Sequence, residues 1–197
     1  MRRSDLKELH YITPIANLPS IRQRGLLSHR RAEALRHKSV AMQEVQDIRA
    51  RKVVPGGLPL HDYVNLYVNA RNPMLYVRSS EHNELAVLRV STAVLDLPNV
   101  VVTDQNAART WVRFAPAPDG LALVDQTCTF AEYWTHDDPL EEYRHKGMMC
   151  AEVLVPHVVP PQHIFGAYVL SREVAERVAE IASWPSVVIN RKLFFRP

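Results

Sequence analysis

Several signatures of common enzyme classes are missing from this 197-residue sequence. It has only six glycines, and neither of the glycine-rich phosphate loops, G-x-x-x-x-G-K or G-x-G-x-x-G, occurs. The absence of G-x-S-x-G argues against a hydrolase nucleophile elbow. No apolar run approaches the roughly 20 residues that cross a bilayer, so no membrane association is expected.

Cysteine and histidine are used in ways that exclude most metal sites. Cys128 and Cys150 are the only cysteines, and no C-x-x-C pair exists. The nine histidines show no metal-ligand spacing, so we expect no metal. No apolar signal segment follows the charged start Met1–Asp5. Two thiols without an export signal predict reduced cysteines and a cytoplasmic protein.

The composition is that of an ordinary globular protein. Hydrophobic residues make up 47% and charged residues 23% of the chain, and the length predicts one domain over residues 1–197. A formal net charge of +3 and a pI near 9.0 make the chain mildly basic. That charge permits a nucleic-acid partner without requiring one.

Hydrophobic periodicity predicts many short strands and few helices, without strict alternation of the two, which is typical of an α+β fold. The segment 126–146 is long, polar and aromatic, which indicates a functional loop or a small helical insertion. The predicted helices are 18–24, 31–37 and 171–182. The predicted strands are 9–12, 63–68, 84–90, 100–102, 149–155, 164–170 and 186–195.

Glu152 is the most informative single residue. It opens the apolar, β-branched stretch 153–155, where an acid is disfavoured unless it is paired or functional. A basic cluster at 144–146 comes just before it. This placement predicts either a salt-bridged glutamate, with Arg144 or Lys146 as partner, or a carboxylate that stabilises a cationic centre.

Four segments, in order along the chain, carry a resemblance to one family. The first is H-Y-I-T at 10–13, followed by N-L-P-S-I at 17–21 and G-L-L at 25–27. L-H-D-Y-V at 60–64, leading to Tyr67 and P-M-L-Y at 73–76, is the most specific. T-D-Q-N-A at 103–107 and A-E-V-L-V at 151–155 complete the series. Together they resemble the DarT family of DNA ADP-ribosyltransferase toxins.

The resemblance implies an ADP-ribosyltransferase-type fold, with two small, mostly antiparallel sheets around an NAD cleft and flanking helices. It also implies a transferase that cleaves NAD and moves ADP-ribose onto a base of single-stranded DNA, without a metal. Such a toxin implies a cognate macrodomain antitoxin. Two departures stand out: Tyr11 occupies the family's usual histidine position, with His10 one place earlier, and Gln105 replaces a glycine.

The resemblance also assigns residues. Glu152 is the expected catalytic carboxylate, and the family's arginine aligns with Arg51, with Arg49 as the alternative. Expected contacts to NAD come from the first half of the chain: His10, Tyr11, Thr13, Asn17, Leu27, Arg51 and Tyr67.

Expected DNA contacts lie in the segment before Glu152, where aromatic rings would stack bases and cations would hold phosphates. They are Tyr133, Trp134, Arg144, His145 and Lys146. Two other functions remain open: a nucleic-acid-binding module that has lost catalysis, and a transferase acting on RNA or protein.

Overall fold

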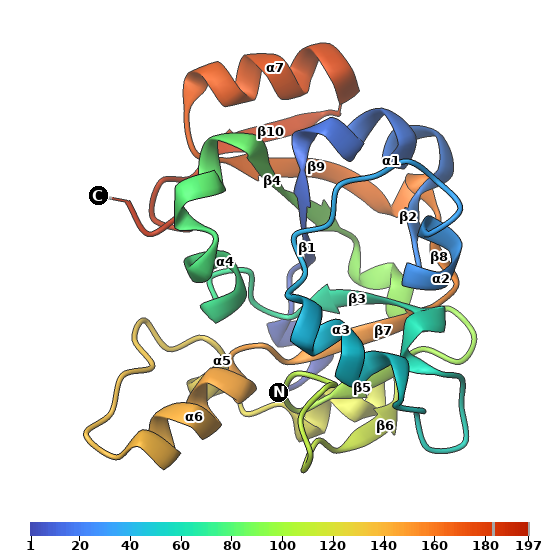
Figure 1. Ribbon diagram of the computed structural model, residues 1–197, viewed down its shortest axis with the longest axis vertical. Helices are drawn as coiled ribbons and strands as arrows, with labels where there is room; N and C mark the ends of the chain where they lie inside the picture. The colour runs from blue at the N-terminus through green and yellow to red at the C-terminus, as the bar shows by residue number, and fades with distance from the viewer. Residues whose placement is uncertain (183, 197) are drawn as a thin grey trace.

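The computed structural model describes residues 1–182 and 184–196 (Figure 1). Its main sheet has eight strands in the order β10-β9-β4-β1-β3-β7-β5-β6, and every neighbouring pair is antiparallel except β9 and β10. The strands are β1 (Leu9–Pro14), β3 (Tyr63–Tyr67), β4 (Leu85–Val90), β5 (Val101–Thr103), β6 (Phe114–Pro116), β7 (Glu152–Pro156), β9 (Ile164–Val169) and β10 (Ser186–Ile189).

This sheet consists of two halves with a narrow joint. Strand β1 pairs with β4 along its whole length, but it meets β3 only at His10 and Tyr67. In Figure 1, β1 runs steeply down the page while β3 and β7 run across it. The two halves therefore diverge from the joint. The α+β prediction is confirmed, with one large, mostly antiparallel sheet and one small sheet in place of the two small sheets expected.

A second, two-stranded sheet joins β2 (Leu26–Leu27) to β8 (Val158–Val159). It depends on Gly25, which ends the preceding helix with a φ of 78°. A Cβ at this position would lie 2.1 Å from the Val159 carbonyl oxygen. Only glycine combines this dihedral with so close an approach.

The helices cover the sheet on different sides. Helix α7 buries Val174, Val178 and Ala182 at the top of Figure 1, where it packs against α1 and the β9–β10 edge. Helix α3 crosses in front of β3 and β7. The bounds are α1 (Leu18–Arg24), α2 (His29–Ala32), α3 (Gln43–Ala50), α4 (Pro73–Val77), α5 (Gln126–Thr129), α6 (Pro139–Met148) and α7 (Arg172–Ala182). None of the helices in the described ranges has the length and apolar character of a membrane span.

Two predicted elements differ most in extent from the observed ones. The helix expected over 31–37 is the single turn α2, which ends at Ala32. The strand expected over 186–195 ends at Ile189, and the chain then turns over 191–195. The turn fully buries Phe194, whose ring meets that of His82 edge-on at 5.2 Å. Burial of one aromatic ring thus outweighs continued pairing at the sheet edge.

Candidate active site

A cavity of about 510 Å³ opens where the two halves of the sheet diverge. Its walls come from β1, β3, α3 and the start of β7, with the segment 38–42 and the loop 106–110 closing the sides. Residues at the joint itself, Tyr67 and Glu152, lie on its wall. The fold thus brings together four segments that are far apart in the sequence.

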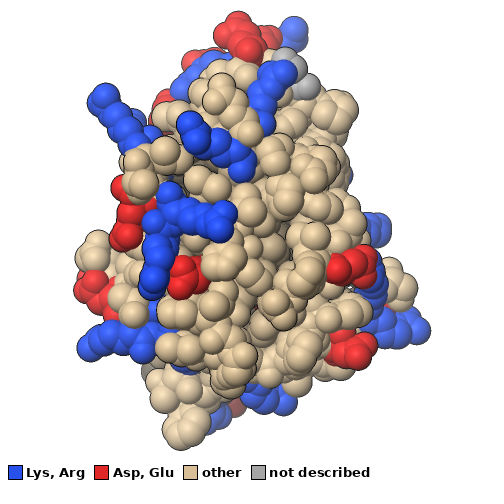
Figure 2. All heavy atoms as spheres, turned by 90° about the vertical axis from the view of Figure 1, so that its right-hand side faces the viewer, with Lys and Arg blue, Asp and Glu red and all other residues tan. Residues whose placement is uncertain are grey.

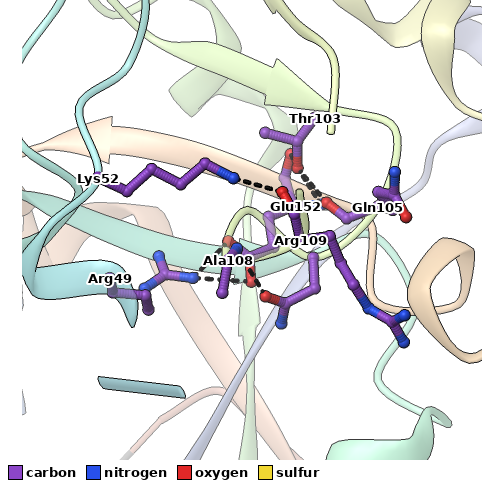
Figure 3. A network of polar contacts seen from close by, with 8 residues as sticks. Arg49, Lys52, Thr103, Gln105, Ala108, Arg109 and Glu152 are labelled. Carbon is purple, nitrogen blue, oxygen red and sulfur yellow. Dashed lines mark hydrogen bonds and ion pairs between the residues drawn. The ribbon is translucent and has the colours of Figure 1, made fainter. Parts of the chain in front are cut away.

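Strand pairing fixes the backbone of Glu152. The residue begins β7, pairs with Tyr67 on β3, and is fully buried. Its backbone N–H donates to Thr103 Oγ1 over 3.1 Å, and that hydroxyl donates to the Gln105 carbonyl over 2.7 Å (Figure 3). These bonds tie the start of β7 to β5 and the following loop. They hold the Glu152 carboxylate on the α3 side of the sheet.

The Glu152 carboxylate forms a buried ion pair with Arg49 of α3. Arg49 Nη1 donates to both carboxylate oxygens, over 3.2 and 3.1 Å (Figure 3). Arg49 is only 4% exposed. Its second terminal nitrogen, Nη2, is buried and has no hydrogen-bond partner among the described residues. One donor group of the guanidinium therefore remains for an acceptor outside the protein chain.

Burial dominates the protonation behaviour of the site. It raises the pKa of Glu152, and the charge and hydrogen bond of Arg49 only partly offset this effect. Burial also raises the pKa of the neighbouring Cys150 thiol to about 12, which favours the protonated form of this cysteine. Burial, then repulsion by Arg49, lowers the pKa of Lys52.

Two predicted cofactor residues shape one side of the cavity through a hydrogen-bond network. Asn17 donates through Nδ2 to Thr13 Oγ1 at 3.2 Å and to the Lys38 carbonyl at 2.8 Å. Its Oδ1 accepts from the Lys38 backbone N–H at 3.0 Å. Asn17 therefore fastens the segment around Lys38 to β1. The network brings Thr13 to the cavity wall, together with Tyr11, Leu27 and Tyr67.

Other cavity residues escaped the sequence analysis. His29 and His61 line the wall with their ring centroids 4.1 Å apart, and burial followed by the charge of His29 lowers the pKa of His61. Arg109 also lines the wall, with its guanidinium 3.5 Å from the Tyr143 ring centroid. His61 lies in the L-H-D-Y-V motif, and this motif was the one sequence feature that could have identified it as a cavity residue. Nothing in the local sequence distinguishes His29 or Arg109.

The structure does not bring Arg51 or His10 to the cavity. Arg51 follows α3, lies exposed, and donates from Nε to the Asp47 carbonyl at 3.1 Å. Two residues along a helix rotate a side chain by about 200°, so Arg49 and Arg51 point in opposite directions. His10 is absent from the cavity wall, and its ring lies 3.3 Å from Glu8 Oε1. The geometry therefore favours Arg49.

The predicted DNA residues divide into exposed and structural groups. Tyr133 is 71% exposed, whereas Trp134 is only 9% exposed and cannot be an open stacking platform. His145 bonds the Cys128 carbonyl at 3.0 Å and His136 at 2.7 Å, so it holds α6 against α5. Arg144 is exposed on α6. Lys146 pairs with Glu142 and reaches the cavity wall.

Charge is unevenly distributed on the surface. On the face shown in Figure 2, lysine and arginine side chains lie around the periphery, most densely on the left, and the centre is largely uncharged. Among the described residues, no group of three or more His, Cys, Asp or Glu side chains is placed to hold a metal ion.

Comparisons with known proteins agree with this geometry. A DNA ADP-ribosyl transferase from a Thermus species is 32% identical over 207 residues, covering 95% of each chain. A fusion of a DNA ADP-ribosyl transferase and a DNA ADP-ribosyl glycohydrolase from Thermosipho africanus is 31% identical over 199 residues. That match covers 97% of this chain and 50% of the fusion protein, so this chain spans about half of that relative.

Solved structures show the same similarity. The DarT protein of Thermus sp. 2.9 in complex with ADP-ribosylated single-stranded DNA matches with a TM-score of 0.84 and 28% identity, covering 98% of each chain. The same Thermus protein with NAD+ matches with a TM-score of 0.79. The model of the family "ssDNA thymidine ADP-ribosyltransferase, DarT" matches residues 10–196. This chain belongs to the DarT family of DNA ADP-ribosyltransferases.

Proposed function

We propose that this chain transfers ADP-ribose from NAD to a thymine base of single-stranded DNA. The observation that carries the proposal is the buried Arg49–Glu152 pair on the wall of the cavity. A fully buried ion pair contributes little to stability by itself, so its place on a cavity wall favours a functional role. The matched family description supports thymidine as the acceptor nucleoside.

The cavity fits NAD in size and chemistry. A volume of about 510 Å³ lies within the usual range for sites that hold small molecules and cofactors. The unpartnered Nη2 of Arg49 offers a donor to a phosphate or ribose oxygen. The Thermus relative has been solved with NAD+ and with carba-NAD+, which supports the same co-substrate here.

Glu152 would act on the NAD ribose while its bond to nicotinamide is replaced by a bond to the DNA base. The bond between ribose C1′ and the nicotinamide nitrogen breaks, and nicotinamide leaves with the electron pair. The oxocarbenium-like ribose that forms is stabilised by a nearby carboxylate. A base nitrogen then bonds C1′ and loses its proton, and a carboxylate with a raised pKa is a suitable acceptor for that proton.

We assign the remaining roles from position. Arg49, rather than Arg51, would hold NAD and keep the Glu152 carboxylate ionised and oriented. Several predicted cofactor residues line the same cavity and keep their assignment to NAD: Tyr11, Thr13, Asn17, Leu27 and Tyr67. His10 is left out, because its ring contacts Glu8 and is not part of the cavity wall.

Biological context follows from the family. We infer that the chain works as a single transferase domain in the cytoplasm, where both NAD and single-stranded DNA occur. Because DNA modification harms its host, a toxin of this kind needs an antitoxin macrodomain that removes the mark. The Thermosipho relative, in which transferase and glycohydrolase are fused, supports such a partner. The intact ion pair disfavours a binding module that has lost catalysis.

The test uses NAD labelled in the adenylate part. Wild-type protein is incubated with separate pools of single-stranded DNA, duplex DNA, RNA and protein, and with a single-stranded oligonucleotide whose thymines are replaced by cytosines. We expect label only on thymine-containing single strands, because a stacked and paired base must first be extruded. Label on RNA or protein instead would assign a different acceptor.

Two variants connect the activity to the carboxylate. Glu152→Gln should lower transfer at least about 100-fold, the usual loss when one preorganised transition-state contact is removed. Glu173→Gln on the exposed side of α7 is the matched control and should leave transfer unchanged. Circular dichroism and NAD binding check that Glu152→Gln is folded. A folded Glu152→Gln protein with near-normal transfer would contradict the proposed role.

A further inference from the structure

The β5–β6 loop, residues 104–113, contacts both the strand that carries Glu152 and helix α6. On the strand side, Thr103 Oγ1 accepts from the Glu152 backbone N–H over 3.1 Å and donates to the Gln105 carbonyl over 2.7 Å. On the helix side, the Asn106 backbone N–H donates to a carbonyl of α6 over 3.1 Å. A displacement of this loop would therefore reach Glu152.

The loop also contacts the Glu152 carboxylate itself. Burial has the largest effect on the pKa of Glu152 and raises it, whereas Arg49 opposes burial most strongly. The Ala107 backbone N–H donates to the carboxylate and opposes burial as well, because a hydrogen-bond donor favours the ionised form. The titratable side chains that face the carboxylate are Arg49, Lys52, Tyr67 and Cys150.

Arg109 fastens this loop to α6. Its guanidinium lies 3.5 Å from the ring centroid of Tyr143 and donates from Nη2 to the Tyr143 carbonyl over 2.9 Å. Gly147, one turn further along α6, leaves room for the guanidinium, since a Cβ there would lie 3.2 Å from Arg109 Nε and 2.8 Å from Gln105 Oε1. Lys52, which follows α3, donates to the Arg109 carbonyl. One residue thus connects α6, the loop and the end of α3.

Arg109 acts at a distance from the carboxylate. In Figure 3 its side chain extends away from Glu152, and its hydrogen bond is to α6. We propose that Arg109 is a positioning residue for Glu152: it clamps the β5–β6 loop on α6 and thereby holds the Ala107 N–H against the carboxylate. The proposal rests on the proposed function and adds a residue to it.

A direct contact with NAD is the competing interpretation, because Arg109 also lines the cavity wall. The two roles need different properties of the side chain. A phosphate contact depends mainly on the charge, which lysine retains. Stacking on Tyr143 together with donation to its carbonyl requires the planar guanidinium. Because the guanidinium is already engaged with α6, the geometry favours the clamp.

The experiment measures transfer to a thymine-containing single strand, with NAD and DNA both saturating, and NAD binding by calorimetry. Arg109→Ala should lower kcat roughly ten-fold or more, because a misplacement of about 1 Å can cost roughly 100-fold. The Kd for NAD should stay within about two-fold of the wild type. The acid limb of kcat/KM for NAD should move to higher pH by about one unit, since the ionised carboxylate loses a hydrogen-bond donor.

Two further variants separate the clamp from the charge. Arg109→Lys should behave like Arg109→Ala, because it retains the charge without the planar group. Gly147→Leu should do the same, because its side chain takes the place of the guanidinium while the arginine is retained. Arg172→Ala, at an exposed position on α7, is the matched control and should leave kcat, NAD binding and the pH profile unchanged. Circular dichroism checks that each variant is folded.

Three results would overturn the proposal. Full kcat in Arg109→Lys would show that the charge matters and the clamp does not. An acid limb that does not move in Arg109→Ala would show that Arg109 does not act through Glu152. A Kd for NAD that rises about ten-fold with an unchanged kcat would assign Arg109 to the co-substrate.

Hydrogen exchange tests the clamp without catalysis. In the absence of NAD and DNA, the backbone amides of residues 105–109 should exchange at least about ten-fold faster in Arg109→Ala than in the wild type or Arg172→Ala. Unchanged protection in Arg109→Ala would overturn the clamp whatever the activity. Failure of the proposed function would appear differently. The wild type would then transfer no label to any strand, while protection of the loop would still depend on Arg109.

Discussion

The buried pair of Arg49 and Glu152 should show a strong energetic coupling that a surface pair lacks. The two side chains are 5% and 0% exposed, and their charged atoms lie 3.1 Å apart. At an effective dielectric constant of 20, two charges 4 Å apart already attract by about 4 kcal/mol. Removing either partner leaves the other charge buried and unpaired, which costs about 3–5 kcal/mol.

We expect Glu152→Leu and Arg49→Met each to lower the free energy of unfolding by about 3–5 kcal/mol. The double variant Arg49→Met/Glu152→Leu should return to within about 2 kcal/mol of the wild type, because two apolar side chains replace the pair without leaving a charge. Unfolding in urea, followed by the fluorescence of the three tryptophans, gives all four free energies. The coupling energy should be at least about 3 kcal/mol.

A matched surface cycle provides the comparison. Arg177 pairs with Glu84 through two hydrogen bonds of 3.0 and 2.9 Å, but their side chains are 39% and 67% exposed. Solvent screens such a pair, so its coupling should not exceed about 1 kcal/mol. If the Arg49–Glu152 cycle proves additive, or no stronger than the surface cycle, the two charges do not interact as the structure indicates.

Two further predictions concern ligand binding and pH. In calorimetric titration, Arg49→Ala should weaken NAD binding at least about ten-fold. Arg51→Ala, at an exposed position, should change NAD binding little. If Arg51→Ala weakened NAD binding more than Arg49→Ala, Arg51 would be the NAD-binding arginine. As the pH is lowered, the kcat/KM for NAD cleavage should begin to fall at a pH above the ordinary pKa range of glutamate. Burial raises the pKa of Glu152, and only the ionised carboxylate stabilises the ribose cation. A profile that stays flat down to pH 4.5 would contradict this assignment.

Burial of Glu152 also connects catalysis to stability. Because the pKa of the folded state lies above that of the unfolded chain, the folded protein binds more protons at this site. The stabilising contribution of Glu152 is therefore complete below the unfolded pKa and is lost as the pH rises through the folded pKa. Activity and this contribution to stability change in opposite directions over the same pH interval.

Local sequence patterns predicted much of the framework. The strand Leu9–Pro14, the amphipathic helix up to Ala182 and the strand beginning at Glu152 lie within a few residues of their predicted positions. Each has clear period-2 or period-3.6 hydrophobicity, which is a local property. The turn at 191–195 was not predicted, because its cause is long-range contact between Phe194 and His82.

The choice of arginine shows where a motif alone becomes ambiguous. Arg49 and Arg51 stand in the same basic segment, and the alignment favoured Arg51. Helical spacing indicates which arginine faces the cavity, whereas the motif does not. Arg49 lies four residues after Val45 and therefore on the same side of the helix, and both residues line the cavity. Arg51 falls on the opposite side of α3 and reaches only the Asp47 carbonyl. Helix phase, applied to the few apolar residues of α3, would have favoured Arg49.

The narrow joint of the sheet explains why the site forms where it does. A continuous sheet would satisfy its backbone by pairing and fill its faces with side chains, leaving no cavity. Here β1 and β3 share only the pair His10–Tyr67, and the next pair along the sheet, Tyr67–Glu152, places the carboxylate beside the opening. Backbone pairing holds Glu152 rigidly, while divergence of the two halves leaves room for a ligand. The fold thus buries a carboxylate without surrounding it completely, which is the condition for both its raised pKa and its access to a ligand in the cavity.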